Sequence, residues 1–278
     1  MVGSDRSGGV RVDPIVGSPA ARIELGDRRV LAIADYHAGI EAGLRYERGI
    51  ELDSNAAERR DRLLALIEET DPDRLVVLGD LAHRIGEPIG DERDELITLF
   101  ETLSDRVPVT VVRGNHDAGL DAFLEDWPRV SLTESAGTVC SGPNGSVGLL
   151  HGHTWPDLEL LSTSVICMGH EHPTVRLTDA VGGSRVEPAW LRGSLNVEFV
   201  IDGSVSLEGG GETTESAPSI DGASRPELVV FPAFNDRSGG TWINVEGQEF
   251  LSPFLPRGLL DGHAYLLDGT RLGPYRSV

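Results

Sequence analysis

The chain has 278 residues, of which 39% are hydrophobic and 25% charged, a composition typical of a globular protein with a sizeable core. Its two cysteines exclude a disulfide scaffold, and no apolar run approaches the roughly 18 residues of a membrane span or resembles the core of a signal peptide. The 45 acidic residues outnumber the 24 basic ones, giving a formal net charge of −21, and we expect a cytoplasmic protein without membrane contact.

The first half of the chain alternates short apolar runs with helical patterns. Residues 1–20 are rich in Gly, Ser and Pro, which predicts a flexible N-terminal arm, and residues 21–278 are expected to form one domain. Apolar runs predict strands at 29–34, 75–79, 108–113, 146–150 and 164–168. Apolar residues recurring every three or four positions predict helices at 56–70 and 92–103. Strands that are apolar throughout, alternating with helices, indicate an α/β fold with covered sheets.

The second half has a different character, because short strand-like segments dominate after residue 174. Strands are predicted at 189–192, 195–201, 228–231 and 241–245. Residues 208–225 form an acidic stretch of low complexity. We expect an inserted surface loop there, since strand patterns resume on both sides.

Seven of the eight histidines follow the ends of predicted strands. They occur, in chain order, in the segments Asp35-Tyr-His37, Gly79-Asp80-Leu-Ala-His83, Gly114-Asn-His-Asp117, His151-Gly-His153 and Gly169-His-Glu-His172. Open α/β sheets place their ligand sites at the carboxyl ends of strands. Imidazole, carboxylate and amide donors without thiolates suit Mn²⁺, Fe or Zn²⁺. The pattern therefore predicts a metal site at these strand ends.

The spacing within two of these segments has a geometric reading. In an extended backbone, residues two apart project to the same side. Asp35 and His37 are therefore expected to reach one ion together, as are His170 and His172, with the residue between each pair pointing away. The glycines that precede several of these residues are expected to let the chain turn sharply toward the site.

The order D-x-H, G-D, G-N-H-D, H and G-H-x-H resembles the calcineurin-like metallophosphoesterase superfamily over about residues 30–173. The segments GDLAHRIG, HGHTWP, GHEHP and PAFNDRSGGTWIN resemble archaeal phosphoesterases related to the SbcD-type DNA repair nucleases. The resemblance implies an αββα sandwich, in which helices flank two packed mixed β-sheets and the active site lies at the C-terminal strand ends. It also implies two divalent metal ions, with Mn²⁺ expected ahead of Fe or Zn²⁺.

Seven positions match the metal ligands of that family. The resemblance assigns Asp35, His37 and His172 to the first ion, Asp80 to a bridge between both ions, and Asn115, His151 and His170 to the second ion. His153 stays open as the alternative to His151, which is preferred because it follows its strand directly.

Other residues match supporting positions. His116 corresponds to the family's histidine that assists the reaction without binding metal, and Asp117 is expected to orient it. His83, His153 and Arg113 are expected to line the site or contact substrate, with a purely structural role as the alternative.

The resemblance implies a metal-dependent phosphoesterase that hydrolyses phosphodiester bonds by attack of a hydroxide activated by the two ions. Two divalent ions, Asp35, Asp80 and one hydroxide leave the site at roughly +1, which attracts a phosphodiester despite the acidic protein. DNA cleavage of the SbcD-related type is the leading specialisation. Hydrolysis of small phosphodiesters, nucleotides or phosphomonoesters is the alternative, followed by a non-catalytic interaction module. Formation of a homodimer stays open.

Two other classes of dinuclear hydrolase agree less well with the sequence. A metallo-β-lactamase-type enzyme requires the motif HxHxDH, which is absent. An amidohydrolase also uses HxH, but its barrel requires eight strand–helix units, and the second half of this chain does not show helical patterns.

All 24 basic residues are arginine. The lack of lysine, the excess of acid and the 5% content of aromatic residues resemble proteins adapted to multimolar salt. A GC-rich genome that encodes Arg in place of Lys is the alternative, and it accounts for the arginines but not for the net charge of −21.

If the acidic surface is an adaptation to salt, the melting temperature is expected to rise steadily from about 0.1 to about 3 M KCl. The Debye length falls from about 10 Å at 0.1 M to about 3 Å at 1 M, so salt screens the self-repulsion of the folded chain. Thermal unfolding followed by circular dichroism measures this. Equal melting temperatures across the series would leave only the genomic explanation.

Overall fold

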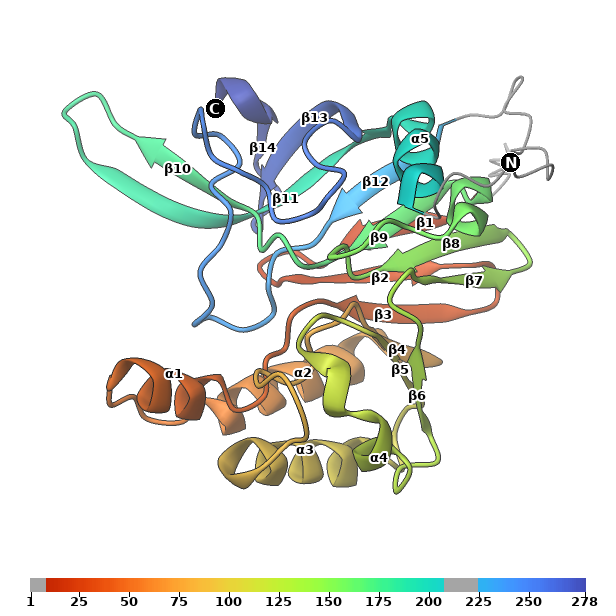
Figure 1. Ribbon diagram of the computed structural model, residues 1–278, viewed down its shortest axis with the longest axis vertical. Coiled ribbons are helices and arrows are strands. Elements are labelled where there is room, and N and C mark those ends of the chain that lie inside the picture. The colour runs from red at the N-terminus through yellow and green to blue at the C-terminus, as the bar shows by residue number, and fades with distance from the viewer. Residues whose placement is uncertain (1–8, 208–224) are drawn as a thin grey trace, which may run out of the picture.

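The computed structural model describes residues 9–207 and 225–278, which form two β-sheets packed face to face (Figure 1). The first sheet contains, in order, β1 (Arg11–Pro14), β2 (Ala20–Glu24), β3 (Arg29–Ile33), β4 (Arg74–Val77), β5 (Val109–Val112) and β6 (Val130–Thr133). The second contains β14 (Arg271–Pro274), β13 (Leu259–Leu266), β11 (Ser184–Leu195), β12 (Glu227–Val230), β9 (Val165–Met168), β8 (Gly145–Leu150) and β7 (Thr138–Gly142), with β10 (Thr174–Thr178) paired to β11. Both sheets are mixed, because β3 to β6 and β8, β9 and β12 pair in parallel and the other pairs are antiparallel.

Helices cover the outer faces of this sandwich. They are α1 (Ile40–Arg48), α2 (Ala56–Thr70), α3 (Gly90–Leu103), α4 (Asp121–Leu124) and α5 (Val197–Leu207), with 3₁₀ turns η1 (Asp117–Gly119), η2 (Leu158–Ser162) and η3 (Tyr275–Ser277). Leu63 of α2 and Phe100 of α3 pack on the first sheet, and Val200 of α5 packs on the second. Among the described residues, no helix has both the length and the hydropathy that a membrane crossing requires. The predicted αββα sandwich of two mixed sheets is confirmed.

Alternate side chains of each strand enter different cores. On β3, Val30 and Ala32 face the second sheet, whereas Leu31 and Ile33 face the helices. Trp190 of β11, only 1% exposed, belongs to the core between the sheets. Burying each such large apolar side chain contributes about 1.5–3 kcal/mol. Because the strands are covered on both faces, their sequences are apolar throughout and show no alternation.

Most elements predicted before β10 are confirmed. The helix expected at 56–70 is α2, and the helix expected at 92–103 is α3, which begins two residues earlier. The five strands expected between residues 29 and 168 are β3, β4, β5, β8 and β9. The sequence pattern missed α1, whose interior Gly43 lowers its helix propensity.

Two strand predictions in the second half are wrong. Residues 195–201 mostly belong to α5, whose start is stabilised by the Asn196 Oδ1 atom accepting a hydrogen bond from the Phe199 amide at 3.4 Å. Residues 241–245 form only an isolated bridge between Thr174 and Trp242. In both segments, tertiary packing outweighs the β-branched composition that suggested strands.

The predicted N-terminal arm is wrong for residues 11–14 and 20. β1 pairs antiparallel with β2, and Val12, 5% exposed, enters the core between the sheets. An edge strand tolerates Pro14, so the Gly-, Ser- and Pro-rich composition did not prevent strand formation. Residues 1–8 and residues 208–224 of the predicted acidic loop lie outside the described residues.

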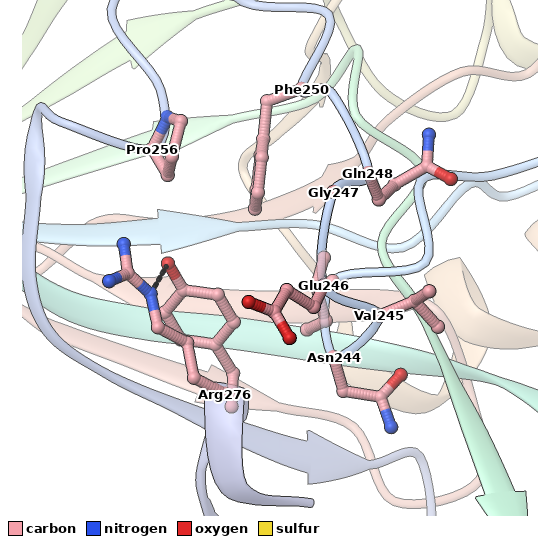
Figure 2. A pocket seen from close by; sticks show the side chains of 10 residues that line it. Asn244, Val245, Glu246, Gly247, Gln248, Phe250, Pro256 and Arg276 are labelled. Atoms are coloured by element: carbon pink, nitrogen blue, oxygen red, sulfur yellow. Dashed lines mark hydrogen bonds between the residues drawn. The ribbon is translucent and has the colours of Figure 1, made fainter.

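The outer face of the second sheet carries a cavity of about 430 Å³ near the C-terminal turn (Figure 2). Phe250 and Pro256 line it, and the Arg276 Nε donates a hydrogen bond to the Tyr275 hydroxyl at 2.9 Å. None of the predicted site residues lines this cavity. It is therefore separate from the cluster of histidines and carboxylates described next.

Candidate metal centre

The loops that follow the parallel strands of both sheets meet at one edge of the sandwich. The His151 Nδ1, after β8, donates a hydrogen bond to the Leu78 carbonyl after β4 at 2.8 Å. The Phe234 amide, after β12, donates to the Ala34 carbonyl after β3 at 2.8 Å. Residues far apart in the sequence therefore converge where both sheets end, as expected for an α/β ligand site.

One cluster of donor atoms comprises Asp35, His37 and His172, whose candidate ligand atoms all lie within 4.8 Å of one another. The His172 Nδ1 donates to the Gly239 carbonyl at 2.8 Å, which leaves the Nε2 atom 3.2 Å from the Asp35 Oδ1. The side chains of Asp35 and His37 are almost fully buried. Three nitrogen and oxygen donors thus face one point.

A second cluster comprises Asp80, His151 and His170, again with ligand atoms within 4.8 Å. The His151 Nε2 lies 3.4 Å from the Asp80 Oδ1 and 3.2 Å from the Asn115 Oδ1. The other carboxylate oxygen of Asp80, Oδ2, lies 3.7 Å from the His37 Nε2. Asp80 therefore stands between the two clusters, with one oxygen toward each.

Both clusters have the properties of cation sites. The His172 Nε2 is buried, faces the Asp35 carboxylate and has no hydrogen bond of suitable geometry among the described residues. Each buried polar atom left without a partner costs about 1–3 kcal/mol, a cost that a bound cation would remove. Imidazole, carboxylate and amide donors without thiolates are suited to Mn²⁺, Fe or Zn²⁺. The residues present therefore fit two divalent ions.

The backbone at these residues is strained. Left-handed φ angles occur at Asp35 (56°), His37 (49°), Asp80 (49°), His170 (69°) and His172 (43°). Only two other non-glycine residues of the described chain have positive φ, so the strain of about 1–2 kcal/mol per residue is concentrated here. The extended geometry predicted for residues 35–37 and 170–172 is wrong. Asp35 and His37 still share one cluster, whereas His170 and His172 lie in different clusters, so the expectation that these two histidines reach one ion together is wrong.

Two of the glycines permit close contact across the site. A Cβ atom on Gly79, whose φ is 82°, would lie 2.3 Å from the His151 Nδ1. A Cβ atom on Gly169 would lie 2.7 Å from the Leu78 carbonyl oxygen. Gly79 therefore serves both the expected turn and the contact, and Gly169 is required for the contact.

Burial and charge set the protonation of the clusters. Burial lowers the pKa of His37 to about 3 and that of His170 to about 4, so both rings are neutral at pH 7 and offer lone pairs. Burial alone would lower the pKa of His151, but the charge and hydrogen bond of Asp80 raise it to about 9. Burial opposes ionisation of Asp80, and the neighbouring His151 outweighs it and lowers the pKa of the carboxyl group. The clusters thus combine ionised carboxylates with nitrogen donors.

His116 lies beside the clusters and is held by a backbone group. Its Nδ1 donates a hydrogen bond to the His83 carbonyl, and its side chain is 25% exposed. The Asp117 carboxylate instead accepts from the Gly114 amide at 2.9 Å and the Ala82 amide at 3.2 Å. The expectation that Asp117 orients His116 is therefore wrong, because both of its oxygens hold the loop backbone.

The His83 ring lines the site. It stacks on His116 with a centroid distance of 5.6 Å, and the candidate ligand atoms of His37, His83 and His116 lie within 4.8 Å of one another. His153 lies next to the second cluster, with its ring centroid 5.3 Å from that of His151, and burial lowers its pKa to about 4.

Arg113 is engaged with a neighbouring acid. Its guanidinium donates two hydrogen bonds to the Asp121 carboxylate, at 2.9 and 2.6 Å, and lies 3.4 Å from the Asp117 carbonyl oxygen. The structure favours the structural alternative for this residue over a contact with substrate. Through this ion pair with Asp121, Arg113 links α4 to the loop after β5.

Two buried residues that support the site were missed from the sequence. The Asn235 amide nitrogen donates to the Asp35 carbonyl at 2.8 Å, while its Oδ1 accepts from the Ser238 amide at 2.7 Å. Glu171 accepts hydrogen bonds from the Thr241 hydroxyl at 2.8 Å and the Ser252 amide at 2.7 Å. A carboxylate placed between two histidines was the available signal, but its partners lie about 70 to 80 residues away.

Comparison with known families identifies the class of protein. Residues 28–203, more than half of the chain, match the family model described as calcineurin-like phosphoesterase. The chain therefore belongs to the calcineurin-like phosphoesterase family. It is a metal-dependent hydrolase of phosphate esters, and its two clusters lie within the matched segment.

A solved structure of another protein has a similar fold. The nuclease MPE of Pseudomonas putida aligns with a TM-score of 0.50 and 17% identity, covering 94% of this chain and 100% of that one. Yfce, a phosphoesterase from E. coli, aligns with a TM-score of 0.35 and 19% identity over 54% of this chain and 74% of that one. No curated protein matches the chain significantly.

Proposed function

We propose that the protein uses two divalent metal ions, Mn²⁺ ahead of Fe or Zn²⁺, to hydrolyse phosphodiester bonds in DNA. The observation that carries the proposal is the position of Asp80, whose Oδ1 is 3.4 Å from His151 and whose Oδ2 is 3.7 Å from His37. One carboxylate between two clusters is the arrangement that holds paired ions. The likeness in fold to a nuclease over 94% of this chain, together with the SbcD-like motifs, supports DNA as the substrate.

The proposal assigns each predicted ligand to an ion. Asp35, His37 and His172 would hold the first ion, Asn115, His151 and His170 the second, and Asp80 both. Two such ions, when bound, would generate a nucleophile from water at neutral pH and offset the charge of the phosphate oxygens.

His116 has the position of a proton donor. A carbonyl only accepts hydrogen bonds, so the His116 Nδ1 must carry a proton toward His83, and the Nε2 atom is free to exchange one. As water oxygen bonds to phosphorus and the ester P–O bond breaks, a His116 ring protonated at both nitrogens would give its Nε2 proton to the leaving oxygen, and the proton lost by the water would pass to solvent, from which the ring regains its own. The products are a phosphomonoester and an alcohol.

An assay of metal dependence tests this function. We expect the chelator-treated protein to be inactive and Mn²⁺ at high KCl to restore cleavage of bis-p-nitrophenyl phosphate and of DNA. Single-stranded DNA, duplex DNA and cyclic nucleotides are compared in the same assay. Activity on cyclic nucleotides alone would show that the substrate is a small phosphodiester and not DNA. A protein that stays inactive with every metal would refute the proposed phosphodiesterase activity.

Substituting Asp80→Asn is expected to remove the bound ions, because both would lose their shared negative charge. Activity should fall by more than the 10- to 100-fold, roughly, that follows the loss of a group merely supporting a ligand. Metal content by mass spectrometry and kcat are measured together. Asp61→Asn, at a carboxylate that is 72% exposed, is the matched control and should change neither. Full metal content in the Asp80 variant would contradict the bridge.

A further inference from the structure

A groove of about 590 Å³ opens between α1 and the segment that leads from β4 to α3. Its walls include Tyr46 on the helix side and His83, Arg84 and Ile89 on the other side. His83 also belongs to the histidine cluster with His37 and His116. The groove therefore lies next to the metal centre and shares His83 with it.

The His83 ring packs closely against α1 at Gly43. A Cβ atom on Gly43 would lie 2.4 Å from the Cδ2 and 2.7 Å from the Nε2 of His83. Glycine within a helix lowers its stability, so an alanine here would favour the helix but exclude the ring. The loop is fixed from below by Glu92, whose Oε1 accepts the amides of His83 and Arg84, both at 2.8 Å.

Large apolar side chains are exposed around this groove. Tyr46 is 90% exposed, Ile89 is 55% exposed, and Ile85, next to Arg84, is 67% exposed. Apolar side chains gathered in the open beside an active site are typical of a ligand surface. The tyrosine presents an aromatic face that no other described ring covers.

Arg84 adds a positive charge to the same wall. Its guanidinium makes no ion pair or hydrogen bond within residues 9–207 and 225–278, although acidic residues outnumber basic ones by 45 to 24 in the chain. Arg45, also in the lining, is by contrast 3.5 Å from the Asp91 carboxylate. Glu47 and Asp91 also line the groove, and Asp91 is paired with Arg45, so we expect an anionic group only beside Arg84, next to the uncovered ring of Tyr46.

We propose that this groove binds the nucleoside on the leaving-group side of the scissile phosphate, with its base stacked on Tyr46 and its next phosphate beside Arg84. The inference rests on the proposed phosphodiesterase function. The side is set by His116, which stacks on His83 and would protonate the leaving oxygen. Stacking requires a free base face, so the strand must be single-stranded at this position.

Dinucleotides with and without a base test the proposal. The Tyr46→Ala variant should lower kcat/KM for dithymidine monophosphate by about 5- to 20-fold, the lower part of the range for one stacked base. For the same dinucleotide lacking the base of the leaving residue, the loss should vanish. Product analysis identifies the leaving residue, because it is released without the phosphate. Tyr46→Phe, which keeps the ring, should behave as the unaltered protein.

Two further variants complete the experiment. Arg84→Gln should lower kcat/KM only for substrates that carry a further phosphate beyond the leaving nucleoside. Val181→Ala, which alters a side chain that is 92% exposed on the turn between β10 and β11, is the control. If the unaltered protein is active and Tyr46→Ala affects both dinucleotides equally, the inference is refuted alone. If the unaltered protein hydrolyses neither dinucleotides nor bis-p-nitrophenyl phosphate with Mn²⁺, the proposed function itself fails.

Discussion

Replacing His116 with alanine is expected to lower turnover by about 10²- to 10⁴-fold while fold and metal content stay unchanged. The His116 Nδ1 is held by the His83 carbonyl, and the side chain is 25% exposed, whereas Asp35 and Asp80 are buried. Such a group would face substrate while remaining fixed, which is what the proposed donation of a proton to the leaving oxygen requires. The loss should be smaller for p-nitrophenyl esters, whose leaving group needs little protonation.

The competing role for His116 is that of a metal ligand, since its ligand atom clusters with those of His37 and His83. Metal content and kcat measured on the same preparation distinguish the two roles. A His116→Ala protein that loses an ion is a ligand variant, and one that retains full activity on poor leaving groups removes the histidine from the reaction. His263→Ala, on β13, is the control for loss of a histidine elsewhere.

Replacing Arg59 with methionine is expected to lower the free energy of unfolding by about 3–5 kcal/mol. Arg59, in α2, is 1% exposed and lies 3.0 Å from Glu41 of α1 and 2.8 Å from Glu95 of α3. Glu95 also accepts the Gly39 amide at 2.7 Å. Without the guanidinium, two buried carboxylates would remain unpaired, and the three helices would lose their common link.

Denaturant unfolding at constant KCl measures this effect. Arg106→Met is the matched control, because its ion pair with Glu68 is exposed and contributes no more than about 1 kcal/mol. Equal stability of the two variants would contradict the role of the buried cluster.

Acid should act through the same cluster. Burial alone would raise the pKa of Glu41, but the hydrogen bonds and charge of Arg59 outweigh it and lower the pKa below its ordinary 4.5. The stability contributed by this carboxylate is therefore present above pH 4.5 and lost as the pH falls through the lower folded value. Arg59→Met should remove that part of the acid dependence.

The donor residues of the site could be predicted because a short stretch of sequence is enough to show both the end of a strand and the type of residue that follows it. Asp80 and His151, for example, follow apolar runs that predict buried strands, as the structure has them. The group that holds His116 could not be predicted, because it is the backbone carbonyl of His83, which any residue would supply. The sequence instead favoured Asp117, whose carboxylate is used by two amides of the same loops.

Other parts of the fold depend on contacts that the sequence does not display. Helix α1 was missed because a glycine within a segment, here Gly43, lowers its predicted helix propensity. The sequence does not show that the His83 ring packs against this glycine and requires it. The strand expected at 195–201 is a helix because Val197 and Val200 share one buried face of α5. In each segment, the partner that decides the conformation lies far along the chain.

The carboxylate of Glu171 connects the metal centre to a part of the chain that lies outside the family match. The match ends at residue 203, yet the hydrogen bonds of Glu171 run to Thr241 and Ser252, beyond that boundary. Its neighbours along the chain are His170 and His172, so the positions of these two histidines depend on contacts with residues 241–252. Residues 241–252 thus help to hold the metal centre in place. A protein truncated after residue 203 would lack these contacts and is expected to bind metal less well.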